Sequence, residues 1–168
     1  MGLNLNKIVW AILAFSIIAC DDHRLFDEYK IIENGWHKDS IITFGFKEPN
    51  PVQPANLFIN VVANNDYKYN NLYLIVSLED PTGFTKVDTL EYGMAHPDGK
   101  LMGEGFSDVK QNKLWYKESF NFPKKGLHKV HIQHAMREQG KIKGVEKLEG
   151  ISKIGFRMEA IKKNNPSK

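Results

Sequence analysis

Three histidines lie three residues apart, at His128, His131 and His134, and imidazole is a common ligand of transition metals. On a helix, this spacing would place all three rings on one face. The surrounding residues instead alternate between apolar and polar, as in a strand, so we expect His128 and His134 on the apolar face and His131 on the opposite face. Strand residues six positions apart are separated by roughly 20 Å, which is too far for one ion. We therefore expect no metal site and no cofactor.

Paired carboxylates could serve general acid–base chemistry, and the nearest pairs are Glu79 with Asp80 and Asp88 with Glu91. Adjacent strand residues point to opposite faces, whereas a glycosidase needs its two carboxyl groups roughly 5–10 Å apart across a cleft. The sequence has no G-x-S-x-G nucleophile elbow. Gly103-Glu104-Gly105 lacks the third glycine of a dinucleotide-binding loop. We therefore expect no enzyme, and a bulge or tight bend at these glycines.

Aromatic side chains could bind sugars or proteins if they lie at the surface. The candidates are Trp36, Trp115, Tyr116, Tyr67 and Tyr69. Packing in the core or at its rim is the simpler interpretation for the tryptophans. Exposed aromatics along a concave face would instead favour carbohydrate binding.

Cys20 is the single cysteine of the chain. Ile17-Ile18-Ala19-Cys20 resembles a bacterial lipobox, in which an aliphatic residue stands three places before the cysteine and a small residue directly before it. A thiolate is the strongest nucleophile among common side chains near neutral pH. We therefore expect a diacylglyceryl group on the sulfur, cleavage by signal peptidase II before Cys20, and acylation of the new amine. No thiol then remains for catalysis, metal binding or a disulfide.

The residues before Cys20 have the pattern of a secretory signal. Lys7 supplies a positive charge, and the run from Ile8 to Ile18 is apolar except for Ser16. As a helix this run would span roughly 16 Å, whereas the hydrocarbon core of a bilayer is about 30 Å thick. A short charged region followed by a short apolar region is typical of a signal peptide. The alternative is an uncleaved anchor, or a core helix with a chance cysteine.

The composition is that of one globular domain, with 168 residues, 42% hydrophobic and 26% charged. A net charge of +3 makes a nucleic-acid partner unexpected. We expect a signal peptide over residues 1–19, a lipid-anchored tether over 20–35, a folded domain over 36–162 and a flexible tail over 163–168. Two or three acyl chains on Cys20 would make attachment to the membrane effectively permanent.

Apolar residues alternate with period two through most of the expected domain, which predicts half-buried strands. Turn-forming clusters separate them, such as Asp80-Pro81-Thr82-Gly83 and Pro97-Asp98-Gly99. The best short helix candidate, residues 137–148, is interrupted by two glycines. We predict a mainly β fold, an antiparallel β-sandwich or jelly-roll-like single domain. The alternating sets are Ile42, Phe44 and Phe46; Leu57, Ile59 and Val61; Leu72, Leu74, Val76 and Leu78; Phe120 and Phe122; Val130 and Ile132; and Ile154, Phe156 and Met158.

Several short motifs follow Cys20 in a distinctive order. They are Tyr69-Asn70-Asn71-Leu72-Tyr73-Leu74, Asp80-Pro81-Thr82-Gly83 leading to Asp88-Thr89-Leu90, the glycines Gly99, Gly103 and Gly105, Gln133-His134-Ala135-Met136-Arg137, and Ile151-Ser152-Lys153-Ile154-Gly155-Phe156-Arg157. With the lipobox, this pattern resembles the GldH family of gliding-motility lipoproteins from the Bacteroidota. The resemblance covers nearly the whole mature chain. The stretch 48–54 departs from it, because it is longer and richer in proline.

The resemblance implies a membrane-anchored accessory protein of surface gliding, tied to the type IX secretion and motility apparatus. It implies a place in the cell envelope, on the periplasmic face or at the outer membrane, contacts with other envelope proteins, and no catalytic residue. We expect Gln133 and Arg137 to share a strand face and to contact a partner. The alternative is an ion pair or hydrogen bond that holds the last strands. The competing functions are a lipid-anchored carbohydrate-binding module and a secreted hydrolase.

Overall fold

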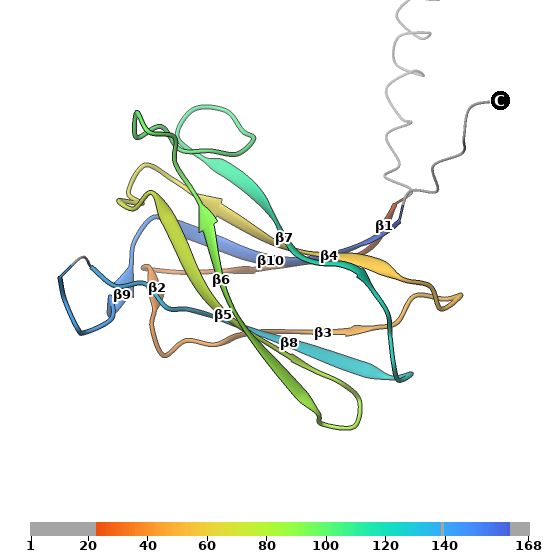
Figure 1. Cartoon of the computed structure of the whole chain (residues 1–168). Helices are drawn as coiled ribbons and strands as arrows, with labels where there is room; N and C mark the ends of the chain where they lie inside the picture. The colour runs from red at the N-terminus through yellow and green to blue at the C-terminus, as the bar shows by residue number, and fades with distance from the viewer. Residues whose placement is uncertain (1–22, 139, 162–168) are drawn as a thin grey trace, which may run out of the picture.

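The computed structural model describes residues 23–138 and 140–161 (Figure 1). The expected signal peptide, Cys20 and the expected tail over 163–168 lie outside these residues. Among the residues that the structure describes, no helix is long and apolar enough to span a bilayer.

The described chain is built from strands. They are β1 (Arg24–Ile31), β2 (Trp36–His37), β3 (Ile42–Lys47), β4 (Ala55–Ala63), β5 (Asn71–Glu79), β6 (Thr85–Gly93), β7 (Lys110–Phe120), β8 (Leu127–His134), β9 (Lys147–Leu148) and β10 (Ile151–Ala160).

The long strands form two four-stranded sheets that face each other (Figure 1). One sheet has the order β1-β10-β4-β7 and the other β3-β8-β5-β6, and every pairing is antiparallel. The pairs β1/β10, β3/β8, β4/β7 and β5/β6 are nested, because the first long strand pairs with the last and so on inward. This nested order is that of a jelly roll. The predicted mainly β, antiparallel sandwich is confirmed.

The core lies between the sheets and follows the predicted alternation. Leu72, Leu74, Val76 and Leu78 of β5 all point inward and are buried. Phe156 of the central strand β10 packs against three other aromatic rings, with centroids 4.9 Å away at Phe46, 6.2 Å at Phe26 and 6.3 Å at Phe44. Burial of such side chains supplies most of the stabilisation of a domain of this size.

β1 corrects the boundary that we expected for the tether. Residues 24–31 pair along their length with β10, so the sheet begins 12 residues before Trp36, where we expected the domain to start. The physical reason is Phe26, whose ring packs against Phe46 and Phe156 in the core. Glu28 and Lys30, the next residues on the same side of the strand as Phe26, are charged and exposed, so the sequence shows no apolar alternation that would predict a strand here.

Other local predictions had mixed outcomes. The described residues of the helix candidate, 137, 138 and 140–148, form no helix but a loop that ends in the two-residue strand β9. β7 ends at Phe120, so Phe122 lies beyond the strand, although its ring still packs against Phe120 with the centroids 5.1 Å apart.

The bend expected at Gly103 and Gly105 is confirmed, because both have positive φ angles, of 106° and 143°. A Cβ atom on Gly103 would lie 2.5 Å from the Gln111 carbonyl oxygen, so only glycine fits there.

The two ends of the sandwich differ (Figure 1). The chain enters at His23 and leaves at Ile161 at one end, which we call the proximal end; it also carries the loops 48–54, 80–84 and 121–126. The opposite end, which we call the distal end, carries the segments 32–41, 64–70, 94–109, 135–138 and 140–146.

Candidate functional site

The expected lipidation site lies next to the proximal end in the sequence. Only two residues separate Cys20 from His23, the first residue that the structure describes. Three residue steps span at most about 11 Å in a fully extended chain. An acyl chain on Cys20 would therefore hold the proximal end close to the membrane.

Gln133 and Arg137 do not share a strand face, which corrects the sequence prediction. Gln133 lies in β8, where its side-chain amide donates a 2.5 Å hydrogen bond to the Lys38 carbonyl oxygen. β8 ends at His134, and Arg137 follows in a loop, where its backbone bridges to Gly144. The Gln133 hydrogen bond fits the alternative prediction, a bond that holds the last strands in place. The Arg137 side chain, by contrast, is exposed at the distal end.

The loop that carries Arg137 is held at its base by Met136. The Met136 side chain is buried, its sulfur accepts a hydrogen bond from the Tyr73 amide at 3.2 Å, and its carbonyl oxygen accepts one from the Val145 amide at 2.8 Å. The described residues of this loop, 137, 138 and 140–144, therefore project from a fixed base. Ile142 in this projection is 92% exposed.

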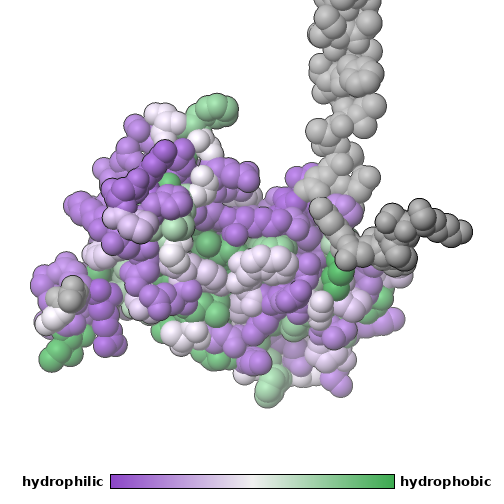
Figure 2. Space-filling model, turned by 45° about the horizontal axis from the view of Figure 1, so that its top comes forward, coloured by the Kyte–Doolittle hydropathy of each residue, from purple (hydrophilic) through white to green (hydrophobic). Residues whose placement is uncertain are grey.

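A second distal loop, residues 94–109, presents another large apolar side chain. The Met94 amide donates to the Asn70 carbonyl oxygen at 2.7 Å, and the Asn65 side chain donates to Asp108 at 3.0 Å, so the loop is tied to segment 64–70. Phe106 is 99% exposed. Figure 2 shows that hydrophilic residues cover most of the visible face, with hydrophobic side chains exposed in small separate groups.

The histidines lie as the strand pattern predicts. His128 and His134 are buried, and His131 lies on the other face, where its ring contacts Thr43 at 2.8 Å and Glu79 at 3.4 Å. The described residues contain no group of three or more histidine, cysteine, aspartate or glutamate side chains suited to a metal ion. The His134 ring instead hydrogen-bonds the Trp36 carbonyl oxygen at 3.0 Å and packs against the Trp36 indole.

His134 should make stability depend on pH. Burial lowers its pKa, although the bond to Trp36 partly opposes this. The neutral ring is favoured in the fold, so its stabilisation is complete above the ordinary histidine pKa of about 6.5 and is lost as the pH falls below that value. We expect the free energy of unfolding to fall by up to about 1.4 kcal/mol per pH unit in this range. Denaturant titrations from neutral to mildly acidic pH should show a smaller slope in His134→Gln than in the wild type. An unchanged slope in His134→Gln would refute the assignment.

The carboxylate pairs singled out in the sequence have structural partners. A hydrogen bond from Lys129 lowers the pKa of Glu79, and one from Thr82 lowers the pKa of Asp80. Asp88 forms an ion pair with Lys117 at 2.8 Å, and Glu91 accepts a hydrogen bond from Asn71 at 2.8 Å. A general acid needs a raised pKa, which is the opposite of what Glu79 and Asp80 show.

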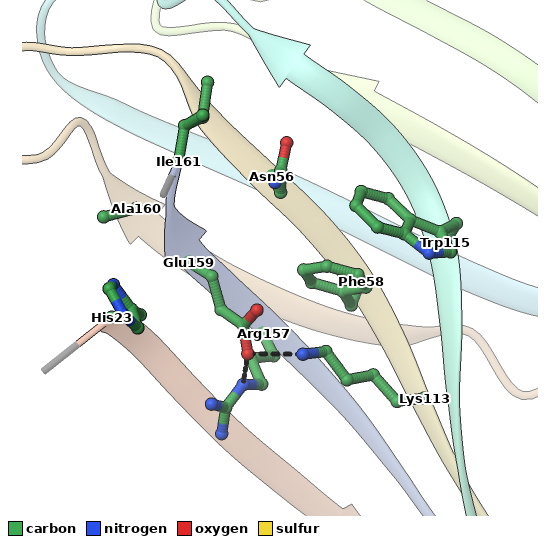
Figure 3. Close-up of a pocket in the computed structure, with 9 residues that line it drawn as sticks. All are labelled: His23, Asn56, Phe58, Lys113, Trp115, Arg157, Glu159, Ala160 and Ile161. Carbon is green, nitrogen blue, oxygen red and sulfur yellow. Dashed lines mark hydrogen bonds and ion pairs between the residues drawn. The ribbon is translucent and has the colours of Figure 1, made fainter. Parts of the chain in front are cut away.

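The two tryptophans of the described chain have different environments. Trp36 is 1% exposed, which confirms core packing, and Tyr116 and Tyr67 are also buried. Trp115 is 55% exposed on the outer face of the sheet β1-β10-β4-β7. It borders a hollow of about 560 Å³ that Lys113, Arg157 and Glu159 also line (Figure 3). The sequence singled out Trp115 but not these charged residues, whose alternation with apolar neighbours is ordinary for strands.

A β-sandwich domain behind a leader that resembles a lipoprotein signal is what we expect of the envelope lipoprotein class. Residues 24–158, which span β1 to nearly the end of β10, match the family model described as GldH lipoprotein. The chain belongs to the GldH lipoprotein family, which confirms the resemblance that its motifs predict, and it is a membrane-anchored lipoprotein of the cell envelope.

Two curated relatives extend over most of the chain. The gliding motility lipoprotein GldH of Flavobacterium johnsoniae is 54% identical over 154 residues, which cover 92% of this chain and 96% of the relative. The gliding motility lipoprotein GldH homolog of Christiangramia forsetii is 46% identical over 151 residues, which cover 90% and 91%.

Proposed function

We propose that this protein is a non-catalytic accessory component of the gliding and type IX secretion apparatus that acts through protein contacts. Acyl chains on Cys20 hold it at the membrane, and the distal end binds other envelope proteins. The observation that carries the proposal is that Phe106 and Ile142, two almost fully exposed apolar side chains, belong to the loops at the end opposite His23.

The dimensions of the sheet support this orientation. β10 runs from the distal end to the proximal end in ten residues. At about 3.3 Å per residue, the distal loops stand roughly 30 Å from the anchored end. A partner that approaches from the periplasm or the cell surface would meet these loops first, whichever leaflet holds the acyl chains.

The chemistry of the distal end suits a protein interface. Energetically important contacts are enriched in aromatic and arginine side chains surrounded by less important ones. Phe106 and Arg137 are of these types and lie in loops whose bases are fixed by backbone hydrogen bonds. In this proposal Arg137 contacts the partner directly, while Gln133 supports the contact by holding the turn at Lys38.

Charged substitutions at the distal end should abolish gliding without unfolding the protein. We expect the double variant Phe106→Asp, Ile142→Asp to lose colony spreading and the cross-linked complexes of the wild type, because a desolvated interface would have to bury two carboxylates. Losing contacts of this kind weakens the free energy of binding by about 2 kcal/mol or more, which corresponds to roughly a thirtyfold loss of affinity. Video microscopy of cells and cross-linking of intact envelopes measure the two effects.

Phe84→Asp is the matched control. Phe84 is 70% exposed, but it lies in the turn 80–84 at the proximal end. This variant should glide normally at equal abundance in the membrane. Normal gliding of the double variant, or an equal defect in the control, would contradict a contact through the distal end.

A further inference from the structure

The outer face of the sheet β1-β10-β4-β7 carries two hollows that meet. The first, of about 560 Å³, lies beside Trp115 and Phe58, and the second, of about 460 Å³, lies beside Asn60. Both are lined by Lys113 and Arg157, so together they form one groove along the sheet. Volumes of roughly 300–1,000 Å³ are usual for small-molecule sites.

An aromatic platform forms one end of the groove (Figure 3). Phe58 is only 3% exposed although its strand position faces outward, because Trp115 packs against it with ring centroids 4.4 Å apart and the Lys113 ammonium lies 4.2 Å from its centroid. The indole of Trp115 is therefore held in place from below while more than half of its surface faces solvent. A rigid, exposed aromatic ring of this kind can stack against the apolar face of a ligand.

The charged residues in the groove neutralise one another. Arg157 bonds to Asp27 at 3.0 Å and to Glu159 at 2.5 Å, and Lys113 bonds to the same Glu159 oxygen, Oε1, at 2.6 Å. Burial alone would raise the pKa of Glu159, but Lys113 and Arg157 hold the pKa below its usual range, so the carboxylate is charged at neutral pH. Two cations thus face the carboxylates of Asp27 and Glu159, and Glu104 adds a third carboxylate at the second hollow. The groove has fixed polar groups but little net charge to attract an ion.

Asn60 supplies a second, independent sign of a ligand. It is 1% exposed and lines the second hollow, and its Oδ1 accepts no hydrogen bond from the described residues. Its Nδ2 donates a long hydrogen bond to Asp27, at 3.5 Å, and the side chain also interacts with the Tyr29 hydroxyl. A buried polar atom without a partner costs about 1–3 kcal/mol, so a ligand that donates a hydrogen bond here would recover that energy.

We propose that this groove binds uncharged carbohydrate, with one sugar ring stacked on Trp115 and hydroxyl groups bonded to Glu159 and Asn60. A sugar ring has an apolar C–H face for the indole, and its hydroxyls both donate and accept hydrogen bonds. Lipid phosphates and nucleic acids would need a net positive site. The inference does not depend on the proposed distal contacts.

The position of the groove gives two sources for such a sugar. His23 lines the first hollow, so an acyl chain on Cys20 would place the groove near the membrane. The sugar could therefore belong to a soluble polysaccharide or to the headgroup of a glycolipid, and the experiment needs one arm for each.

The test uses the full mature lipoprotein in a detergent that has no sugar headgroup. Isothermal titration calorimetry would follow binding of hexasaccharides of glucose, mannose and N-acetylglucosamine, and vesicles with and without glycolipid would form the second arm. We expect at least one hexasaccharide or the glycolipid vesicles to bind. Trp115→Ala should weaken that binding about tenfold or more, and Trp115→Phe should restore part of it. Phe84→Ala, which removes an exposed ring outside the groove, should bind as the wild type does.

Three results would overturn the proposal. The first is no binding of any hexasaccharide up to about 10 mM, a limit that corresponds to a binding free energy weaker than about 3 kcal/mol, together with no binding of the glycolipid vesicles. The second is an equal loss in Trp115→Ala and Phe84→Ala when circular dichroism shows both to be folded. The third is Trp115-dependent binding to plain anionic vesicles without any sugar binding, which would assign the face to membrane contact instead.

Discussion

Replacing Phe156 with alanine will lower the free energy of unfolding by about 3–5 kcal/mol, which is the usual cost of removing a buried phenylalanine. The Phe156 ring is fully buried on the central strand β10, between rings contributed by β1 and by β3. Its loss would leave a cavity where the two sheets meet, and few side chains there can move to fill it. Chemical denaturation of the purified protein measures the change.

Phe84→Ala is the comparison for this prediction. The same side chain is removed from an exposed turn, and a surface change of this kind alters stability by about 0.5 kcal/mol or less. If both variants unfold at the same denaturant concentration, Phe156 does not occupy the centre of the core as described.

Replacing Cys20 with serine will remove the mature acylated form of the protein. A serine hydroxyl is far less nucleophilic than a thiolate, so no diacylglyceryl group is added, and signal peptidase II has no modified residue to recognise. We expect mass spectrometry to find a chain that lacks acyl mass and has not been cleaved before position 20. Cells with this variant should not glide, because the domain is no longer held in its place by acyl chains.

Ser16→Ala is the control for this second prediction. It changes the apolar run of the leader and leaves Ile17-Ile18-Ala19-Cys20 intact, so acylation and gliding should persist. An acylated mature form in Cys20→Ser, or normal gliding in its absence, would refute the assigned role of this residue.

The strands that were predicted correctly are those with one face in the core. β5 and β8 alternate strictly between buried and partly exposed residues, so period-two patterning locates both and also sorts the three histidines onto their faces. β10 follows the same pattern at Ile154, Phe156 and Met158. Because the core of a sandwich needs this alternation, the fold class could be predicted from sequence.

The strands that escaped prediction are edge strands. β6 is mostly exposed along its length, and β1 pairs on one side only, with β10. Strands of this kind bury few side chains, so their residues carry little alternation, and their place in the sheet comes from backbone pairing. Local sequence does not encode which distant strand supplies that pairing.

The exposure of Trp115 follows from its strand position. Residues 110–115 pair in one register with residues 58–63, so Trp115 points to the outer face together with its partner Phe58. The β-bulge in β7 comes after this point, where Leu57 pairs with Lys117 and Tyr116 is an extra residue. Sequence could name both tryptophans as candidates, but which of them faces solvent depends on how their strands pair.

The exposed side chains of the distal loops could not be predicted from the sequence either. Phe106 and Ile142 lie in segments without periodic patterning, and an apolar residue there is as easily explained by packing as by exposure. Two motifs of the family resemblance contain Asn70 and Met136, whose backbone groups hold the distal loops. These motifs therefore indicate that the distal end matters. They do not show which side chains project.

Site-specific photo-crosslinking in living cells would show which end of the protein contacts its partners. A photo-reactive amino acid would replace Phe106 or Ile142 at the distal end and, in parallel strains, Phe84 or Ile161 at the proximal end. We expect discrete protein adducts from positions 106 and 142 and none of the same size from positions 84 and 161. Adducts from the proximal positions alone would mean that partners bind the end next to the membrane.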